Sequence, residues 1–146
     1  IAAAYHDAGF VEQRTDHEAI GAELSKTAMT ADGRFSSEDI SQVYRMILDT
    51  KLNPIGPSHT ISTPLSPWLL DSDLANLGRG DFLEKTKLLA TELQIPIESM
   101  LKESLALMNR HRWLSPAGVQ QLTQQKEMNK ETVIRMLKES DKAELL

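Results

Sequence analysis

Two stretches of the chain combine histidine and aspartate in a way that could hold a metal ion. In the first, His6 and Asp7 follow one another at the end of an alanine-rich segment that should be helical. In the second, residues 69–78 read LLDSDLANLG and place Asp71 and Asp73 among leucines. A mixed set of imidazole and carboxylate groups suits a divalent transition metal such as Mn, Fe, Co, Ni or Zn, whereas Ca and Mg prefer all-oxygen sites. Metal binding is therefore the chemistry that these residues predict.

The second stretch has the start signal and the apolar arc of an amphipathic helix. Ser66 and Pro67 are typical of the N-cap and first helical positions, and Gly78 follows the expected end. At about 100° per residue, the leucines at positions 69, 70, 74 and 77 fall on one arc of about 140°. Asp73 projects from inside that arc and Asp71 from outside it. We therefore predict that Asp73 points inward and that Asp71 faces solvent.

A carboxylate on the apolar side of a helix needs a positive partner. An isolated buried carboxylate costs several kcal/mol, even after the protein relaxes, unless it is paired or coordinates a metal. His6 and Asp7 are the co-ligands that we expect for Asp73. We predict that Asp73 lies within a few ångströms of one of them.

The segments AAAYHDAGF, DHEAIGAEL and LLDSDLANLG together resemble the HD-domain superfamily of metal-dependent phosphohydrolases, in its small all-helical branch. The resemblance covers about residues 1–90. The metal site of that family consists of a histidine from an earlier helix, the His-Asp doublet and a distant aspartate. By motif, the doublet is His6 and Asp7 and the distant aspartate is Asp73. The resemblance thus implies a metal centre built on these three residues.

The resemblance also implies a reaction, and the chain departs from the family pattern at two places. A metal-activated water would hydrolyse a phosphate ester, either a nucleotide or a related phosphomonoester or diester. The first histidine of the family lies upstream of Ile1, so we expect an N-terminal portion that carries it to be missing from this chain. Relatives often carry a histidine after a Thr-Lys pair, where this chain has Leu52 and Asn53. That departure favours one bound ion over two.

Four more side chains are candidates for the site, and three of them have an equally concrete structural role. His17 opens the inward face of a helix expected at about residues 16–30. It either binds a second metal ion, orients a bound water, or is a partly buried histidine bonded to backbone or carboxylate. Lys51 either binds phosphate or complements a helix dipole. His59 lies in a long loop, residues 52–65, and either contacts substrate or is solvated. Arg79, in a turn, is a fourth substrate-binding candidate.

The rest of the pattern predicts an all-α fold. Capped segments with apolar residues at i, i+3, i+4 and i+7 recur along the chain, and strand-like alternation is absent. We expect six to eight helices around one core in a single domain, residues 1–146, with a metal-site part (1–90) and a C-terminal helical extension (91–146). Thr15 and Glu18 match a capping box. Asn129 or Lys130 should break the last helix, whose tail is either packing material or a subunit contact in a homo-oligomer.

Composition narrows the classes of function. Sixteen Lys and Arg against 21 Asp and Glu give a net charge of -5, which argues against a nucleic-acid coat and leaves a small phosphorylated substrate open. The absence of cysteine excludes thiolate metal sites and fits a cytoplasmic location. No apolar run is long enough to span a membrane. A second class of function stays open, namely an HD-fold regulatory or protein-interaction domain that has lost turnover.

Overall fold

The chain folds as an all-α protein, as its sequence predicts. The computed structural model describes the backbone of residues 1–143 and the side chains of residues 1–140. Within that range, the regular elements are seven α-helices and two short 3₁₀ helices, without a strand. The chain divides into two compact units, unit 1 (Ile1–Asp73) and unit 2 (Leu74–Leu146).

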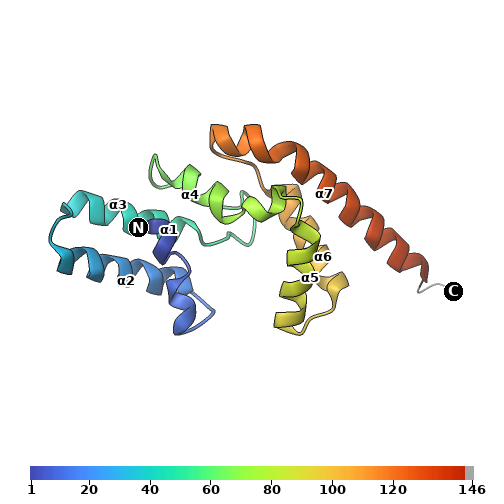
Figure 1. Cartoon of the computed structure of the whole chain (residues 1–146), viewed down its shortest axis with the longest axis horizontal. Coiled ribbons are helices and arrows are strands. Elements are labelled where there is room, and N and C mark those ends of the chain that lie inside the picture. Colours follow the sequence, from blue (N-terminus) through green and yellow to red (C-terminus); the bar gives the residue numbers. More distant parts are fainter. Residues whose placement is uncertain (144–146) are drawn as a thin grey trace. The chain divides into compact units, whose positions relative to one another are not determined.

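Unit 1 is held together by one apolar cluster to which each of its α-helices contributes. The elements are α1 (Ala2–Tyr5), η1 (Ala8–Val11), α2 (His17–Asp32), α3 (Ser37–Asp49) and α4 (Ser66–Asp73). The buried residues of the cluster are Ala2, Ala22, Ile47 and Leu69, one from each α-helix. Figure 1 shows α2 and α3 running side by side, and α3 also packs against α1 and α4. The core of unit 1 therefore joins α1, which precedes His6 and Asp7, to α4, which ends at Asp73.

The starts of α2 and α3 differ in how well they follow the local sequence. Ser36 caps α3: its Oγ accepts the backbone N–H of Asp39 (3.1 Å), and the Asp39 carboxylate accepts the N–H of Ser36 (3.0 Å). The box expected between Thr15 and Glu18 is wrong. The residue before α2 is Asp16, whose backbone is left-handed (φ 56°) and whose side chain makes no cap bond. That carboxylate is engaged in a tertiary ion pair with a lysine just beyond α3.

Two glycines let backbone segments of unit 1 touch. A Cβ on Gly9 would lie 2.0 Å from the carbonyl oxygen of His17, and a Cβ on Gly21 would lie 2.3 Å from the carbonyl oxygen of Tyr5. Side chains do not tolerate such distances, so both positions require glycine. Gly9 thereby lets η1 lie against the start of α2, and Gly21 lets α2 approach the end of α1.

Unit 2 has a hydrophobic cluster of its own. Its elements are η2 (Ala75–Gly78), α5 (Phe82–Leu93), α6 (Ile97–Arg110) and α7 (Pro116–Ala143). The buried residues of the cluster are Leu77, Phe82, Leu101, Met108 and Val133. Where we expected one core, the described residues thus form two separate buried clusters, one in each unit.

The last helix is continuous, and the break expected at Asn129 or Lys130 is wrong. α7 runs without interruption over 28 residues. Asn129 is buried, and its Nδ2 donates to the carbonyl oxygens of Leu77 (2.9 Å) and Arg79 (2.8 Å). Asparagine has a low intrinsic helix propensity. Here that cost is offset because the side chain of Asn129 binds η2 to α7 through these hydrogen bonds.

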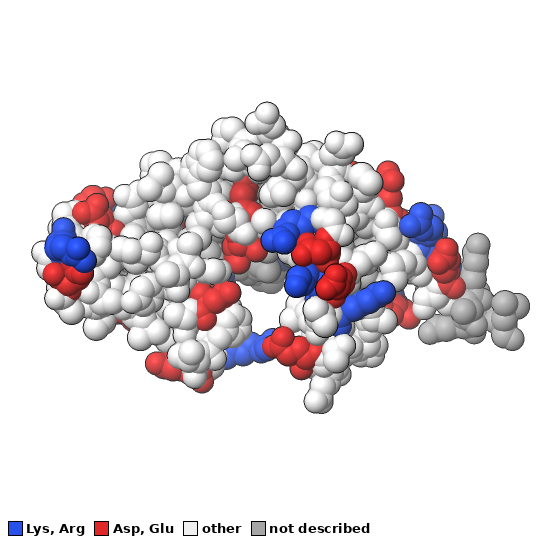
Figure 2. Space-filling model, in the orientation of Figure 1, with Lys and Arg blue, Asp and Glu red and all other residues white. Residues whose placement is uncertain are grey.

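The surface carries both signs of charge. On the face that Figure 2 shows, Lys and Arg side chains are interspersed with Asp and Glu side chains, and the described residues form no broad basic area there. None of the described helices is long and apolar enough to cross a bilayer.

Candidate functional site

Four side chains of unit 1 meet where the sequence predicted a metal centre. His6 Nε2 lies 3.3 Å from Asp7 Oδ2 and 3.2 Å from Asp73 Oδ1. His17 Nε2 lies 3.4 Å from the other oxygen of Asp7, Oδ1. The predicted proximity of Asp73 to the doublet is thus confirmed, and His17 lies in the same cluster. Below, these four residues are called the His-Asp cluster.

Local structure fixes the orientation of both imidazole rings in the cluster. His6 Nδ1 lies 3.0 Å from the carbonyl oxygen of Ala3, and His17 Nδ1 lies 3.0 Å from the carbonyl oxygen of Arg14. Because a carbonyl oxygen can only accept, each Nδ1 must carry a hydrogen. In a neutral ring the opposite nitrogen, Nε2, is then a bare acceptor that faces carboxylate oxygens, which are acceptors too. A proton, carried by the ring or by the carboxyl group, or a shared cation must therefore lie between each Nε2 and its carboxylates.

The four residues come from different elements that the core and a glycine bring together. His6 is the C-cap of α1 and Asp7 is the next residue, whereas His17 is the first residue of α2. The close approach at Gly9 lets η1 reach the start of α2, so that the Phe10 ring stacks on the His17 ring with centroids 3.8 Å apart and planes inclined by 20°. Asp73 is the last residue of α4.

The prediction that Asp71 faces solvent is wrong. Asp71 is buried with 4% of its surface exposed, whereas the side chain of Asp73 is 25% exposed. The predicted arc treated residues 69–77 as one helix, but α4 ends at Asp73 and η2 begins at Ala75. Leu77 belongs to the core of unit 2, so the leucines used to set the phase do not share one helical face. The inward position of Asp73 follows from its contact with His6 instead.

Burial and a neighbouring carboxylate make Asp73 hard to ionise. Desolvation is the largest influence on the pKa of Asp73 and raises it above the ordinary value, and the charge of Asp7 raises it further. His6 and His17 oppose both effects when they are charged. A cation at this place would relieve the same penalty, since it stabilises the charged carboxylate.

Lys51 is paired with a residue that adjoins the cluster in sequence. Its Nζ forms an ion pair with Asp16, the residue before His17, and the charge of Glu18 also acts on it. The hydrogen bond between the two side chains holds the pKa of Asp16 below its usual value and the pKa of Lys51 above its usual value. Both side chains are more than half exposed, so the pair contributes little to stability. Lys51 can therefore exchange Asp16 for another anion at low cost.

The two other substrate-binding candidates, His59 and Arg79, differ in burial and in partners. His59 is buried, with 8% of its surface exposed, so the alternative of a solvated loop histidine is wrong. Arg79 belongs to unit 2, where its guanidinium forms two hydrogen bonds with Asp81, of 3.1 and 3.2 Å.

The sequence did not single out two neighbours of His17. Phe10 stacks on its ring, and Glu18 Oε2 lies 3.6 Å from its Nδ1. Glu18 follows His17 directly but was assigned to a helix cap, and Phe10 carried no signal of its own. The nearby Gly9 permits the close approach on which the stack depends.

The cluster contains the right donors for a transition metal, although it is not yet a metal-binding group. Among the described residues, no three His, Asp or Glu side chains converge as a group that could hold an ion. They form a string of pairs instead, with Asp7 giving one oxygen to each histidine. In kind the residues fit, because two ligands about 2.0–2.2 Å from one ion lie about 3–3.5 Å apart. The observed separations of 3.2–3.4 Å match this range.

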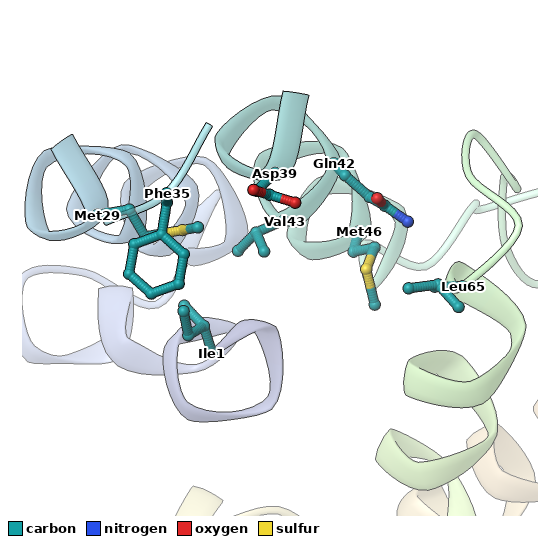
Figure 3. Close-up of a pocket in the computed structure, with 8 residues that line it drawn as sticks. All are labelled: Ile1, Met29, Phe35, Asp39, Gln42, Val43, Met46 and Leu65. Atoms are coloured by element: carbon teal, nitrogen blue, oxygen red, sulfur yellow. The ribbon is translucent and has the colours of Figure 1, made fainter. Parts of the chain in front are cut away.

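A pocket in unit 1 lies apart from these residues. It measures about 430 Å³ and is mainly apolar, lined among others by Met29, Phe35 and Met46 (Figure 3). Asp39 is the carboxylate in its lining, and this group accepts hydrogen bonds from the N–H and the hydroxyl of Ser36. Because that carboxylate is already occupied in a helix cap, the pocket offers little acid–base or metal chemistry.

Comparison with protein-family models, with curated proteins and with solved structures finds no match to this chain. The HD-domain resemblance accordingly stays a prediction from the sequence motifs. Function has to be inferred from the side-chain chemistry of unit 1.

Proposed function

We propose that unit 1 carries the metal centre of a hydrolase that cleaves a phosphate ester. One observation carries the proposal: His6 and His17 both turn Nε2 toward carboxylates while a backbone carbonyl holds each Nδ1. Metal-ligating histidines in proteins commonly have this arrangement, in which the second nitrogen is fixed by a carbonyl or carboxylate. The sequence motifs that resemble HD-domain phosphohydrolases contain the same residues.

The residues divide into ligands and groups that act beside them. His6, Asp7 and Asp73 would hold one divalent transition metal ion. When bound, that ion supplies a nucleophile by lowering the pKa of a coordinated water. His17 Nε2 would orient the water or protonate the leaving oxygen, which is general acid–base work suited to a histidine. Lys51 would leave Asp16 and bind a phosphate oxygen.

The substrate class is a small phosphate ester. The side chain of Asp7 is 57% exposed, so the cluster is open to solvent and to a ligand of modest size. Nothing in the cluster selects a leaving group, and nucleotide monophosphates, cyclic nucleotides and other esters fit equally well. We expect the reaction to take place in the cytoplasm, in line with the absence of cysteine.

One observation favours a second candidate, a domain of this fold without turnover. The side chains do not yet converge on a common point. If both rings carried a proton on Nε2, imidazolium–carboxylate pairs would satisfy the cluster without any metal. The two candidate functions therefore differ in what lies between the histidine Nε2 atoms and the carboxylate oxygens. It is a metal ion in the hydrolase and a proton in the domain without turnover.

Metal content and turnover of purified variants separate the two candidates. We expect the unaltered protein to hydrolyse phosphate esters with added Mn or Ni, and His6→Ala and Asp73→Asn each to lose both the metal and the activity. Asp81→Asn is the matched control, since its side chain is 30% exposed against 25% for Asp73 and it also has a cationic partner. Asp71→Asn is unsuitable as a control because Asp71 is buried. Full activity of metal-free Asp73→Asn would end the proposal.

His17→Ala tests the division of roles. If His17 transfers a proton, turnover should fall by about 10²–10⁴-fold while the metal stays bound. If it only packs against Phe10, the melting temperature should fall while the rate per folded molecule stays nearly unchanged. Retained turnover in a less stable His17→Ala protein would therefore remove His17 from the mechanism.

A further inference from the structure

A buried carboxylate that no motif identifies lies at the other end of α4 from Asp73. Asp49 is the last residue of α3 and has 4% of its surface exposed. Its Oδ2 accepts the backbone N–H of Ser62 (2.8 Å), the hydroxyl of Ser62 (2.9 Å) and the hydroxyl of Ser66 (2.5 Å). Ser66 is the first residue of α4 and is fully buried. One charged oxygen thus connects the end of α3, the preceding loop and the start of α4.

The hydrogens in this network can be placed by counting. The single hydroxyl hydrogen of Ser66 goes to Asp49, so in the 2.9 Å contact between Thr63 Oγ1 and Ser66 Oγ the donor must be Thr63. Thr63 Oγ1 also accepts the backbone N–H groups of Leu65 (3.3 Å) and Ser66 (3.1 Å). The donors therefore run in one direction, from Thr63 through Ser66 to Asp49. Such a chain requires a strong acceptor at its end, which a carboxylate provides.

α4 depends on its attachments for its position. It has only eight residues, and isolated helices shorter than about 12–15 residues are marginal in water. One attachment is Leu69, whose side chain lies in the core of unit 1. Another is the hydrogen bond from Ser66 to Asp49. At 1.5 Å per residue the helix is about 10 Å long, so a tilt of about 10° at Ser66 would displace Asp73 by roughly 2 Å.

We propose that Asp49 is a positioning residue for Asp73, which it holds beside His6 by fixing the start of α4. The role of Asp73 as a metal ligand rests on the proposed function, whereas its placement beside His6 does not. Because the His6–Asp73 separation is 3.2 Å, a displacement of roughly 2 Å at the far end of α4 separates the pair. Asp49 itself touches neither residue in any described contact.

The test compares two identical substitutions at fully buried serines. Ser66→Ala removes the hydroxyl that bonds to Asp49. Ser25→Ala is the control, because Ser25 is equally buried and its hydroxyl bonds only to the Ala22 carbonyl (2.8 Å) in the same helix. Asp49→Asn is the second test variant, since it keeps the shape and removes the charge. All are made in the full chain.

The first measurement needs neither metal nor turnover. Ring signals of His6 in NMR spectra of the metal-free protein, assigned with His6→Gln, report on the partner at Nε2. We expect Ser66→Ala and Asp49→Asn to move them more than halfway to their positions in Asp73→Asn, and Ser25→Ala to leave them in place. Wild-type His6 signals in both test variants, with melting temperatures lowered as in Ser25→Ala, would overturn the proposal. If Asp49→Asn does not fold, Ser66→Ala decides.

The second measurement is the affinity for Zn²⁺ alone. Loss of a residue that orients a ligand typically weakens metal binding by about 10–100-fold, and we expect that loss in Ser66→Ala and Asp49→Asn but not in Ser25→Ala. If the unaltered protein binds no Zn²⁺ and hydrolyses nothing, the proposed function fails, and the His6 signals still decide whether Asp49 positions Asp73. Equal Zn²⁺ affinity in the unaltered protein and the three variants would contradict a role of Asp49 in positioning Asp73 for metal binding.

Discussion

Histidines occur in two polar clusters of this protein that are built in opposite ways. In unit 1, the Nε2 atoms of His6 and His17 face carboxylates. In unit 2, buried His111 faces a buried ammonium, because Lys126 Nζ lies 3.1 Å from His111 Nδ1 and donates to its carbonyl oxygen at 2.7 Å. An ammonium can only donate, so His111 Nδ1 is the acceptor and the ring hydrogen lies on Nε2.

The comparison shows that the groups beside a histidine decide which ring nitrogen carries the hydrogen. They also decide whether a cation is attracted to the site or repelled from it. The carboxylates of unit 1 favour a cation. The Lys126 ammonium of unit 2, which also lies 5.8 Å from the Trp113 ring, repels one. Imidazole is therefore not sufficient to identify a metal centre. The groups around each imidazole distinguish a candidate ligand from a packed structural residue.

The largest expected difference between the clusters is in metal affinity. His6→Ala should weaken Zn²⁺ binding by more than about 100-fold, beyond the range for outer-shell partners, because it removes a ligand. His111→Ala should leave the affinity unchanged. Calorimetric titration of both variants measures this. Equal losses in the two variants would mean that the contrast between the clusters does not govern metal binding.

The next effect in size is on folding of unit 1. Gly9→Ala places a Cβ 2.0 Å from the His17 carbonyl and should cost about 1–3 kcal/mol as an overpacked contact. Gly80→Ala in unit 2 is the control, since a Cβ there has no atom within 4 Å. Urea unfolding gives both free energies. If Gly9→Ala is as stable as Gly80→Ala, the close approach of η1 to α2 is not required.

A smaller effect concerns alkaline pH and unit 2. Desolvation lowers the pKa of Lys126, so the folded state binds that proton less tightly than the unfolded state. Stability should therefore rise as the pH increases toward the ordinary lysine pKa of about 10.4. Lys126→Met should lack this rise. Thermal unfolding of both proteins between pH 8 and about pH 10 tests it, and a parallel pH dependence would contradict the assignment to Lys126.

The smallest expected effect is a gain in the stability of the metal-free protein when Asp73 loses its charge. The raised pKa of Asp73 means that the folded state binds a proton there more tightly than the unfolded state, so this group's contribution is present at low pH and lost as the pH rises through its folded pKa. At neutral pH without metal, Asp73→Asn should therefore raise the melting temperature by about 2–4 °C. With Zn²⁺ present the order should reverse. A lower melting temperature of the metal-free variant would contradict the unfavourable burial of Asp73.

The sequence predicted the fold class and the meeting of distant residues better than it predicted local detail. Helical periodicity was sufficient for an all-α fold, and the need of Asp73 for a cationic partner correctly placed it beside His6. The position of Asp71 was wrong because helical phase cannot be carried past the unseen end of α4. The continuity of α7 through Asn129 depends on contacts about fifty residues away, which no local pattern contains.

The positioning role of Asp49 could not be predicted from sequence at all. A lone aspartate at a helix end is common, and its donors come from a loop whose path the sequence does not specify. Burial of His59 in the same loop was missed for the same reason. Propensity and spacing describe helices well, whereas the irregular segment between α3 and α4 depends on tertiary hydrogen bonds.

The i−3 carbonyl bonds of the two histidines bear on the order in which the protein folds. Each ring is oriented by a residue three positions away, which requires almost no loop closure. The contact of His6 with Asp73 instead closes most of unit 1 into a loop, and such contacts form late because their entropy must be lost first. We therefore expect the carbonyl bonds of His6 and His17 to be formed in the folding transition state. The contact between His6 and Asp73 should form after it. Substitutions at Asp73 should then change the unfolding rate and leave the folding rate nearly unchanged.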